Sequence, residues 1–312
     1  MPTDWPELPY ADLKATCETL RLWTQIVGKI RLARSPWLNH SWQVTLYVTA
    51  RGLTTSLIPH PNGGFDLEFD FTGQVLRLRT SWGPAADIAL QPQSVAAFYG
   101  QVMDALARAG APTTINVTPS EFPDPVMPFP EDHAPRVYDP EVAHQFWRAL
   151  VRVDEVFKLF RSGFLGKASP VHLFWGSFDL AVTRFSGRRA PSHPGGVPHL
   201  PDAVAREAYS HEVSSAGFWP GGPGVEYPAF YAYAYPEPPG FRDAAVGPEG
   251  AVFNPQLGEF LLPYETVRAA PDPQAALLTF LSSTYAAAAD AGHWDRAALE
   301  CGTGQPGIPR EA

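Results

Sequence analysis

Cysteine is scarce in this chain of 312 residues, which has two, Cys17 and Cys301, and no CxxC pair. A disulfide framework is therefore not expected, and a cytoplasmic location is the default prediction. Long apolar runs are missing as well. No stretch reaches the length of a membrane span, and the first residues, MPTDWPELPY, lack the basic and apolar regions of a secretory signal. No membrane partner is predicted.

Charged residues make up only 18% of the chain, and acidic residues outnumber basic ones, 32 to 23, for a formal net charge of −9. Proteins that follow nucleic-acid phosphates usually present a basic face, so a nucleic-acid partner is not expected. Several familiar motifs are also missing. There is no P-loop, no GxSxG elbow and no HxH or HExxH spacing. Nucleotide binding and serine-hydrolase chemistry therefore have no positive support.

Proline and aromatic residues are abundant instead. The chain has 34 prolines together with 19 phenylalanines, 11 tyrosines and 9 tryptophans, and both classes exceed their average usage in proteins. Many rigid, extended segments and aromatic-lined surfaces follow from this composition. The aromatic content is too high for a disordered chain, so we expect a globular protein with a substantial core.

Five segments show the periodicity and the end signals of helices. Apolar residues recur in them at three- and four-residue spacing. Asp139-Pro140 and Asp272-Pro273 each combine an N-cap with a proline at the first helical position, and Gly110 is a suitable C-terminal cap. The predicted helices cover residues 10–29, 94–109, 139–160, 202–209 and 272–291.

Alternating apolar and polar residues predict strands, and the hairpin at residues 65–80 gives the strongest signal. In its predicted register Phe69 opposes Leu76 while Glu68 opposes Arg77, so both faces agree on one alignment. Residues 190–224 are predicted to be rich in loops. The other predicted strands cover residues 40–49, 53–58, 229–235 and 259–262.

Residues 166–189 are predicted to form a second hairpin, whose turn is Gly176-Ser177, with glycine at the first position as in a type II′ turn. In that register His172 opposes Ala181, and Phe174 opposes Asp179. One face of the hairpin is apolar and should meet the core. The other face carries His172 and Asp179 as diagonal neighbours, so it is either a site or a solvated surface.

The order of these elements predicts an α+β fold of two related halves. Each half contains a helix, a β-hairpin, two further strands and a helix, with antiparallel sheets and helices packed outside. The predicted organisation is an N-terminal half at residues 1–115, a proline-rich connector at 116–138, a C-terminal half at 139–301 and a flexible tail at 302–312. A pocket is expected between the two halves.

The chain also resembles a known family over nearly its full length. The strings that carry the resemblance are QIVGKIRLA, LYVTARGLTT, SPVHLFWGSFDLAVTRFSGR, GFWPGG and AYAYPEP. They are similar to those of a bacterial family of uncharacterised proteins, known only as a domain of unknown function. The resemblance implies a bacterial protein in which the whole chain is one family unit. It brings no assigned reaction, cofactor or catalytic residue.

His172 is the centre of two hypotheses about chemistry. In the first, Asp179 orients His172 for general acid–base catalysis, and the alternative is a structural hydrogen bond between them. In the second, His172, His211 and Glu212 contribute to a site for a transition metal such as iron or zinc. The alternative is that the loop histidines are merely solvated. No other cofactor is suggested.

A cluster of cations lies at the open end of the same hairpin. Lys167, Arg184 and Arg188 are predicted to bind a carboxylate or phosphate of the substrate, with Lys29, Arg31 and Arg51 as further candidates. The alternative is that these side chains form ion pairs with the abundant acidic residues.

Aromatic side chains are predicted to line the ligand cavity, since binding pockets are mainly apolar with a few polar groups. Phe218 and Trp219 belong to the string GFWPGG, which is predicted to be an irregular loop. Core packing is the alternative for each of these side chains. The predicted aromatic lining consists of Trp175, Phe218, Trp219, Tyr231, Tyr233 and Tyr235.

These features together predict a small-molecule enzyme that acts on an anionic or aromatic metabolite with acid–base or metal-assisted chemistry around His172. The alternative is a non-catalytic ligand-binding or sensor protein that uses the same cleft. The substrate, the reaction and the oligomeric state do not follow from the sequence.

Overall fold

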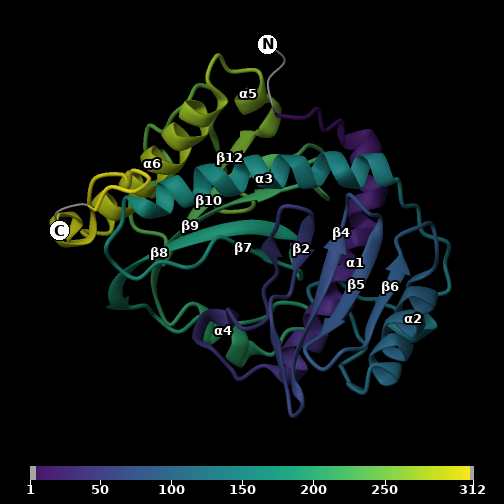
Figure 1. The fold of residues 1–312 in the computed structure, drawn as a ribbon. Helices are drawn as coiled ribbons and strands as arrows, with labels where there is room; N and C mark the ends of the chain where they lie inside the picture. Colours follow the sequence, from purple (N-terminus) through teal and green to yellow (C-terminus); the bar gives the residue numbers. More distant parts are fainter. Residues whose placement is uncertain (1–4, 310–312) are drawn as a thin grey trace.

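A computed structural model describes residues 5–309 of the chain. Within these residues the fold is α+β, with seven α-helices and two antiparallel sheets of six strands each (Figure 1). The first sheet comes from the N-terminal part of the chain and the second from the C-terminal part. The α+β prediction is confirmed. An internal duplication is not shown, because helix α4 interrupts the second set of strands and the two strand orders differ.

The first sheet has the strand order β1-β2-β4-β5-β6, and β3 pairs with the N-terminal end of β4. In β4 and β5 Phe69 opposes Leu76 and Glu68 opposes Arg77, which confirms the predicted hairpin register. The strands are β1 (Tyr47–Val48), β2 (Gly52–Thr54), β3 (Ile58–His60), β4 (Gly63–Asp70), β5 (Val75–Thr80) and β6 (Ala85–Ala89).

Helices α1 (Tyr10–Arg34) and α2 (Val95–Arg108) cover the apolar face of this sheet. Trp23 of α1 stacks on Phe98 of α2 with ring centroids 4.5 Å apart, and Phe98 in turn stacks on Phe69 of β4. Ser94 caps α2 by accepting a hydrogen bond from the Ala97 amide, a common role of serine at the start of a helix. Helix α1 runs five residues beyond its predicted end, and Ile30 and Arg31 of this extension are buried.

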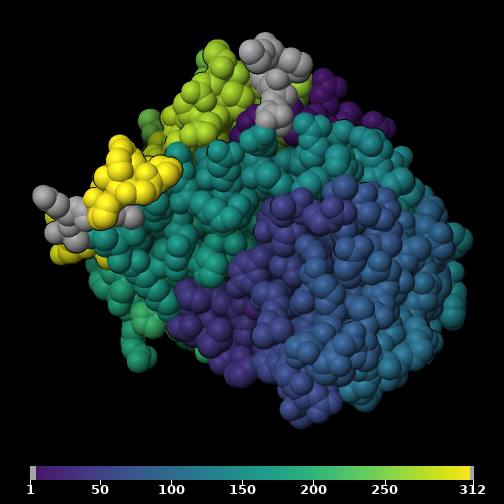
Figure 2. Space-filling view, viewed as in Figure 1, coloured from purple at the N-terminus to yellow at the C-terminus, as the bar shows by residue number. Residues whose placement is uncertain are grey.

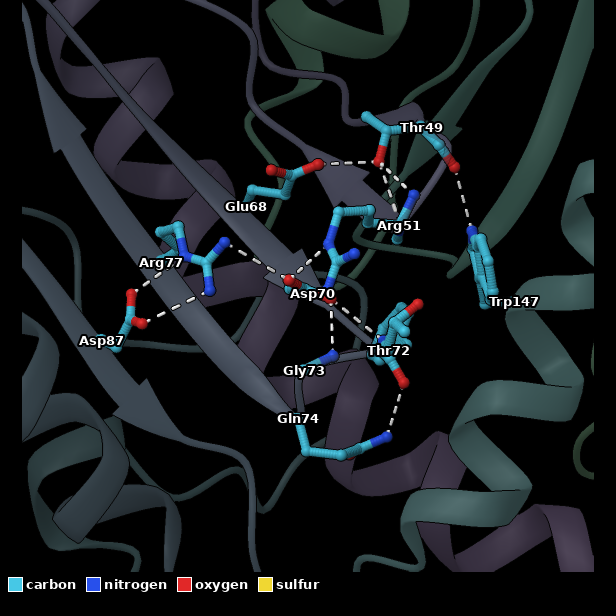
Figure 3. A network of polar contacts seen from close by, with 12 residues as sticks. Thr49, Arg51, Glu68, Asp70, Thr72, Gly73, Gln74, Arg77, Asp87 and Trp147 are labelled. Carbon is cyan, nitrogen blue, oxygen red and sulfur yellow. Dashed lines mark hydrogen bonds and ion pairs between the residues drawn. The ribbon is translucent and has the colours of Figure 1, made fainter.

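The other face of the first sheet carries a polar network centred on Asp70, whose side chain is fully buried (Figure 3). Its carboxylate accepts hydrogen bonds from Arg51 Nε at 2.7 Å and from the backbone amide of Gly73 at 2.7 Å. Arg77 lies 3.5 Å away and also pairs with Asp87. Burial by itself would raise the pKa of Asp70, but the hydrogen bonds from Arg51 and Gly73 outweigh it and lower this pKa.

The second sheet has the order β11-β12-β10-β9-β8-β7, and all its pairs are antiparallel. Its edge hairpin has the predicted register, with His172 opposite Ala181 and Phe174 opposite Asp179. The strands are β7 (His172–Phe174), β8 (Asp179–Arg189), β9 (His211–Trp219), β10 (Ala229–Tyr235), β11 (Val252–Asn254) and β12 (Glu259–Pro263).

One face of the second sheet packs against α3 (Pro140–Ser162) and α6 (Pro273–Ala291), and α3 crosses above it in Figure 1. Both helices begin as predicted, with Asp139 and Asp272 capping them. Phe218 of β9 belongs to this core face and packs against Phe146 of α3. The shorter helices are α4 (Asp202–Ala208), α5 (Tyr264–Arg268) and α7 (Arg296–Leu299).

The two sheets meet at an isolated bridge between Leu46 and Leu173, whose backbone groups exchange two hydrogen bonds of 2.9 and 2.8 Å. Trp175 adds a second contact at the same place, because its indole N–H donates a hydrogen bond to the Val44 carbonyl at 2.8 Å. One cluster of buried apolar side chains runs through both parts, and their surfaces adjoin without a gap in the view of Figure 2. Among the described residues, no helix is long and apolar enough to cross a membrane.

Three local predictions are wrong. Residues 40–49 form a 3₁₀ turn and only the two-residue strand β1, because His40 and Ser41 adopt left-handed backbone that breaks an extended segment. Phe218 and Trp219 are not in a loop but at the end of β9. The turn between β7 and β8 is not type II′, because Phe178 rather than Gly176 has the positive φ, at 63°.

The Asp70 network predicts a defined loss of stability. Replacing Asp70 by Asn removes the charge that holds Arg51 and Arg77, so we expect the free energy of unfolding to fall by about 2 kcal/mol at neutral pH. The lowered pKa of Asp70 means that its contribution is present above about pH 4 and disappears as the pH falls through its folded-state pKa. Urea unfolding of D70N and of the half-exposed control D87N measures this effect. Equal losses in the two variants would contradict it.

Candidate functional site

The face of the second sheet that points away from α3 borders a cavity of about 760 Å³, which we call the sheet cavity. Its floor comes from strands β8, β9 and β10. Its walls come from α4, from residues 37–44 and from the connector at residues 114–121. A cavity of this size holds a metabolite-sized ligand. The predicted polar face of the hairpin therefore faces the cavity, with Asp179, Ala181 and Thr183 of β8 in its lining.

Three carboxyl groups from distant segments line the sheet cavity: Glu121 from the connector, Asp179 from β8 and Glu259 from β12. Asp179 is buried, and it raises the pKa of each of the other two carboxyl groups through like-charge repulsion. Folding thus gathers negative charge at one place in a mainly aromatic environment. Such a group of acids is unfavourable for the folded state unless a ligand or a proton neutralises it.

Asp179 is the anchored member of this group. Ser177 Oγ and Tyr231 Oη each donate a hydrogen bond to its carboxylate. Burial raises the pKa of Asp179, while the two hydrogen bonds lower it in part. Burial and the nearby Asp179 in turn raise the pKa of Tyr231 well above its ordinary value, so this phenol remains a hydrogen-bond donor.

Tyr231 reaches Asp179 because glycine occupies the strand between them. Tyr231 lies on β10 and pairs with Gly217 of β9, which pairs with Ala181 of β8. A Cβ atom placed on Gly217 would lie 2.3 Å from the Tyr231 ring and hydroxyl. The ring therefore occupies the space where any other residue would carry its side chain. Gly217 is required here for close approach.

Glu121 is held above the β7–β8 turn. Arg21 of α1 donates to the Glu121 carbonyl at 2.9 Å and to the Gly176 carbonyl at 2.7 Å, which ties the connector to the turn. The carboxyl group lies against Gly176, where a Cβ atom would lie 1.9 Å from Glu121 Oε1. Burial, followed by the charge of Asp179, raises the pKa of Glu121 to about 7, although Arg21 and Lys29 oppose the shift.

Glu259 begins β12 and faces the same cavity. Burial, followed by Asp179, raises its pKa to about 7. The backbone of Glu259 pairs with Asn254 of β11, but its carboxylate makes no hydrogen bond or ion pair with any residue from 5 to 309. It is thus the acid of the cavity with the least compensation for its charge.

Lys29 is a nearly buried cation in the lining. Its Nζ donates to the Thr118 carbonyl at 2.8 Å and to Ser120 Oγ at 2.9 Å. Burial lowers the pKa of Lys29 to about 8, against the opposing effect of Glu121. The group is therefore mostly protonated at neutral pH and balances one of the three acids.

Aromatic rings complete the lining. Tyr231 and Tyr233 stack with centroids 6.1 Å apart at an interplanar angle of 15°. The Tyr233 hydroxyl lies 2.9 Å from that of Tyr209, which follows α4. Trp175 and Trp219, both predicted as ligand contacts, also line the cavity. The structure therefore brings together Asp179, Trp175, Trp219 and Tyr233 from the predicted site.

Other predicted site residues lie elsewhere. His172 is fully buried outside the lining, and its Nδ1 donates to the Pro170 carbonyl at 2.8 Å. No hydrogen bond joins it to Asp179 within the described part of the chain, so the two have separate partners. Burial lowers the pKa of His172 to about 4, and Arg31 adds to the effect. The imidazole is therefore neutral at physiological pH.

The predicted cation cluster is dispersed. Arg184 projects to the core face, where its guanidinium lies 3.6 Å from the centre of the Phe160 ring. Arg188 pairs with Glu212 at 2.6 Å. Lys167 lies nearest to the cavity, with its Nζ 2.6 Å from Nε2 of the lining residue His40. Phe218 is fully buried in the core rather than in the lining.

The proposed metal ligands do not come together either. His211 contacts His40 edge to face, Glu212 pairs with Arg188, and His172 is buried on β7. Between residues 5 and 309 no cluster of three or more histidine, cysteine or acidic side chains is arranged to hold a metal ion. The glycine spacing GxGxxG occurs at residues 302–307, but in irregular chain after α7, without the strand and helix that dinucleotide binding requires.

Sequence reasoning missed Glu121 and Glu259. Glu259 had a usable signal, because it alternates with Phe260 and Leu262 and so belongs to the polar face of its strand. Glu121 had none, because it lies in an irregular segment that only tertiary contacts place beside the sheet.

A family model described as "Family of unknown function (DUF5996)" matches residues 5–301. No curated protein and no solved structure matches the chain. The sheet cavity is formed entirely within the matched residues.

The burial of His172 predicts a loss of stability in acid. Its folded-state pKa, about 4, is below the ordinary value of 6.5, so the unfolded chain binds the proton more readily. This contribution to stability is complete above about pH 6.5 and is lost as the pH falls toward 4. Between about pH 7 and pH 5 we expect a loss of about 2 kcal/mol that H172Q lacks. Parallel curves of unfolding free energy against pH would contradict this prediction.

The raised pKa of Glu259 predicts the opposite dependence. The folded state binds this proton more readily, so the relative stability that it provides is present below about pH 4.5 and is lost as the pH rises through 7. At about pH 8 we expect E259Q to be more stable than the wild type by about 1–2 kcal/mol, and the gain should vanish near pH 5. The exposed control E265Q should show no gain. A destabilised E259Q at pH 8 would contradict the prediction.

Proposed function

The chain belongs to DUF5996, a family of unknown function, and we propose that it is a small-molecule enzyme whose active site is the sheet cavity. In this proposal the carboxyl groups of the cavity, rather than His172, carry out general acid–base chemistry. The observation that carries the proposal is the convergence of Glu121, Asp179 and Glu259 on one metabolite-sized cavity, two of them with a pKa of about 7.

A group with a pKa near the ambient pH is suited to proton transfer, because it is present in both protonation states. Glu121 has this property, because burial and the charge of Asp179 raise its pKa while Arg21 and Lys29 oppose the rise. We assign Glu121 as the group that exchanges a proton with the bound molecule. Because the three acids repel one another, the protonation of each depends on the protonation of the others, and the apparent pKa values belong to the group as a whole.

Asp179 has a positioning role in this scheme. It fixes the phenol of Tyr231 by accepting a hydrogen bond from its hydroxyl, and its charge adds to the effect of burial in raising the pKa of Glu121 and Glu259. Burial of the two glutamates disfavours their charged forms, which keeps the shifts large. This arrangement resembles that of other acid–base sites, where neighbouring carboxyl groups are driven to different pKa values.

Backbone conformation supports the same location. Eight non-glycine residues between 5 and 309 have a positive φ, and four of them, His40, Ser41, Glu121 and His199, line the sheet cavity. Left-handed backbone is unfavourable for such residues, and it persists where tertiary contacts enforce it. Glu121, at φ 63°, is one of these strained residues. Strain of this kind is concentrated at functional sites more often than elsewhere.

The test is a turnover assay without a chosen substrate. The purified chain is incubated with a bacterial metabolite extract, and mass spectrometry records which compounds disappear and which appear. We expect compounds that the wild type consumes and that E121Q consumes at least about a hundredfold more slowly, the range for loss of a general acid or base. The rate should change around pH 7, because the pKa of Glu121 is about 7.

The matched control is E131Q, an exposed glutamate in the same connector, which should consume the same compounds at the wild-type rate. Compounds that bind the chain without being consumed by any form would overturn the enzyme assignment and leave a ligand-binding or sensor protein. Equal consumption by E121Q and the wild type would remove Glu121 from the chemistry.

A further inference from the structure

We infer that the ligand of the sheet cavity is an amine with an aromatic or apolar body, and that Glu259 and the stacked rings of Tyr231 and Tyr233 receive its ammonium group. The inference rests on the proposed function, because it names the substrate class of the same cavity. It is carried by the distribution of charge and by the aromatic geometry around Glu259.

The positive groups around the cavity all have protein partners. Lys29 donates to Thr118 and Ser120, and Arg21 donates to the backbone carbonyls of Glu121 and Gly176. These two cations lie at the Glu121 side of the cavity. The histidines of the lining are also engaged.

His199 pairs with Asp124, and His40 has contacts to Ala208 and Lys167. Among residues 5–309, therefore, no cation serves the remaining side of the cavity, where Glu259 lies. The negative charge of Asp179 repels that of Glu259. Among residues 5–309, no arginine, lysine or histidine forms an ion pair with Glu259.

The Glu259 side of the cavity lacks a positive charge from residues 5–309, and a cationic ligand would supply one. An ammonium group placed beside Glu259 would attract the charge of both Glu259 and Asp179, which are close enough to influence each other. An anionic ligand would face three acids, of which the protonated Lys29 balances only one, and would be repelled. The cavity therefore favours an amine over the anionic metabolite expected from the sequence, whose predicted cations Arg184 and Arg188 point elsewhere.

The tyrosines supply the second component of an ammonium site. Tyr231 and Tyr233 stack nearly parallel beside Glu259, and the charge of Glu259 acts on both phenols. Aromatic faces attract ammonium groups through their quadrupoles. The hydroxyls of both tyrosines are engaged, Tyr231 with Asp179 and Tyr233 with Tyr209. Their rings, rather than their hydroxyls, are thus available to a ligand.

The apolar part of the ligand has a matching wall. Trp175, Trp219 and Phe174 line the cavity from the hairpin and from the end of β9. Flat aromatic surfaces of this kind accept a ring or an apolar chain. An arylalkylamine fits both parts, with its ring among these side chains and its ammonium group at Glu259.

The experiment compares matched ligands by isothermal titration calorimetry at low salt and neutral pH. The amines are tyramine, phenethylamine and benzylamine. Their neutral isosteres are tyrosol, phenylethanol and benzyl alcohol, and para-hydroxyphenylacetate is the anionic counterpart. We expect each amine to bind at least about tenfold more tightly than its alcohol, and the anion to bind more weakly than tyrosol.

The variant E259Q should bring each amine to within about twofold of its alcohol and leave the affinity for the alcohols unchanged. E265Q removes the same charge from the exposed surface of α5 and should change neither affinity. Amine binding should also release protons, because a bound ammonium favours the ionised carboxyl groups. Titration in two buffers with different ionisation enthalpies detects this release.

Alcohols that bind as tightly as amines would overturn the amine inference while the proposed function stands, since the cavity would still bind small molecules. Amine binding that E259Q leaves intact would overturn it as well, because the ammonium would then bind elsewhere. If none of the three amines binds, the inference is wrong. The turnover assay with E121Q then decides the proposed function separately, because it depends on no chosen ligand.

Discussion

The sheet cavity depends on a polar contact that helix α1 makes with the proline-rich connector. Arg21, Gln25 and Lys29 are spaced four residues apart, so they lie on one stripe of α1. Arg21 donates to the carbonyls of Glu121 and Gly176, Gln25 exchanges two hydrogen bonds of 2.8 Å with the Ser120 backbone, and Lys29 binds Thr118 and Ser120. A connector with so many prolines has few neighbours that could satisfy its backbone groups, and α1 supplies them. Through this stripe, α1 holds Glu121 against the second sheet.

The same stripe explains why the two sheets act as one unit. The first sheet and α2 hold α1 through Trp23 and Phe98, and α1 holds the connector over the β7–β8 turn. The bridge between Leu46 and Leu173 joins the sheets directly. Within the second sheet, Gly217 leaves room for the Tyr231 side chain to cross β9 and reach Asp179. The hydrogen bond from Arg21 therefore positions Glu121, and the missing side chain of Gly217 lets Tyr231 reach Asp179. Both acids line the sheet cavity.

Much of this fold follows from local sequence signals, and the candidate site follows from them only in part. The caps at Asp139 and Asp272, the register around Phe69 and the pairing of Phe174 with Asp179 were all predictable, because helix ends and hairpins are determined by residues near in sequence. The placement of Glu121 was not, because it depends on α1, a hundred residues away. Strand β9 was missed because its string GFW looks like a loop, although Gly217 is there to accommodate Tyr231. Arg184 was predicted to contact substrate because it follows the hairpin, but strand alternation after Val182 turns it toward the core.

Burial explains why carboxyl groups, and not a histidine, are suited to neutral-pH chemistry in this protein. In water a histidine titrates near neutrality and a carboxyl group near pH 4, so the sequence alone points to His172. Removal from water disfavours the charged form of either group, which moves the two in opposite directions. The pKa of His172 falls to about 4, and those of Glu121 and Glu259 rise to about 7. A histidine that is buried without an acid partner thus loses its ability to exchange protons, while clustered acids beside an aromatic wall acquire it.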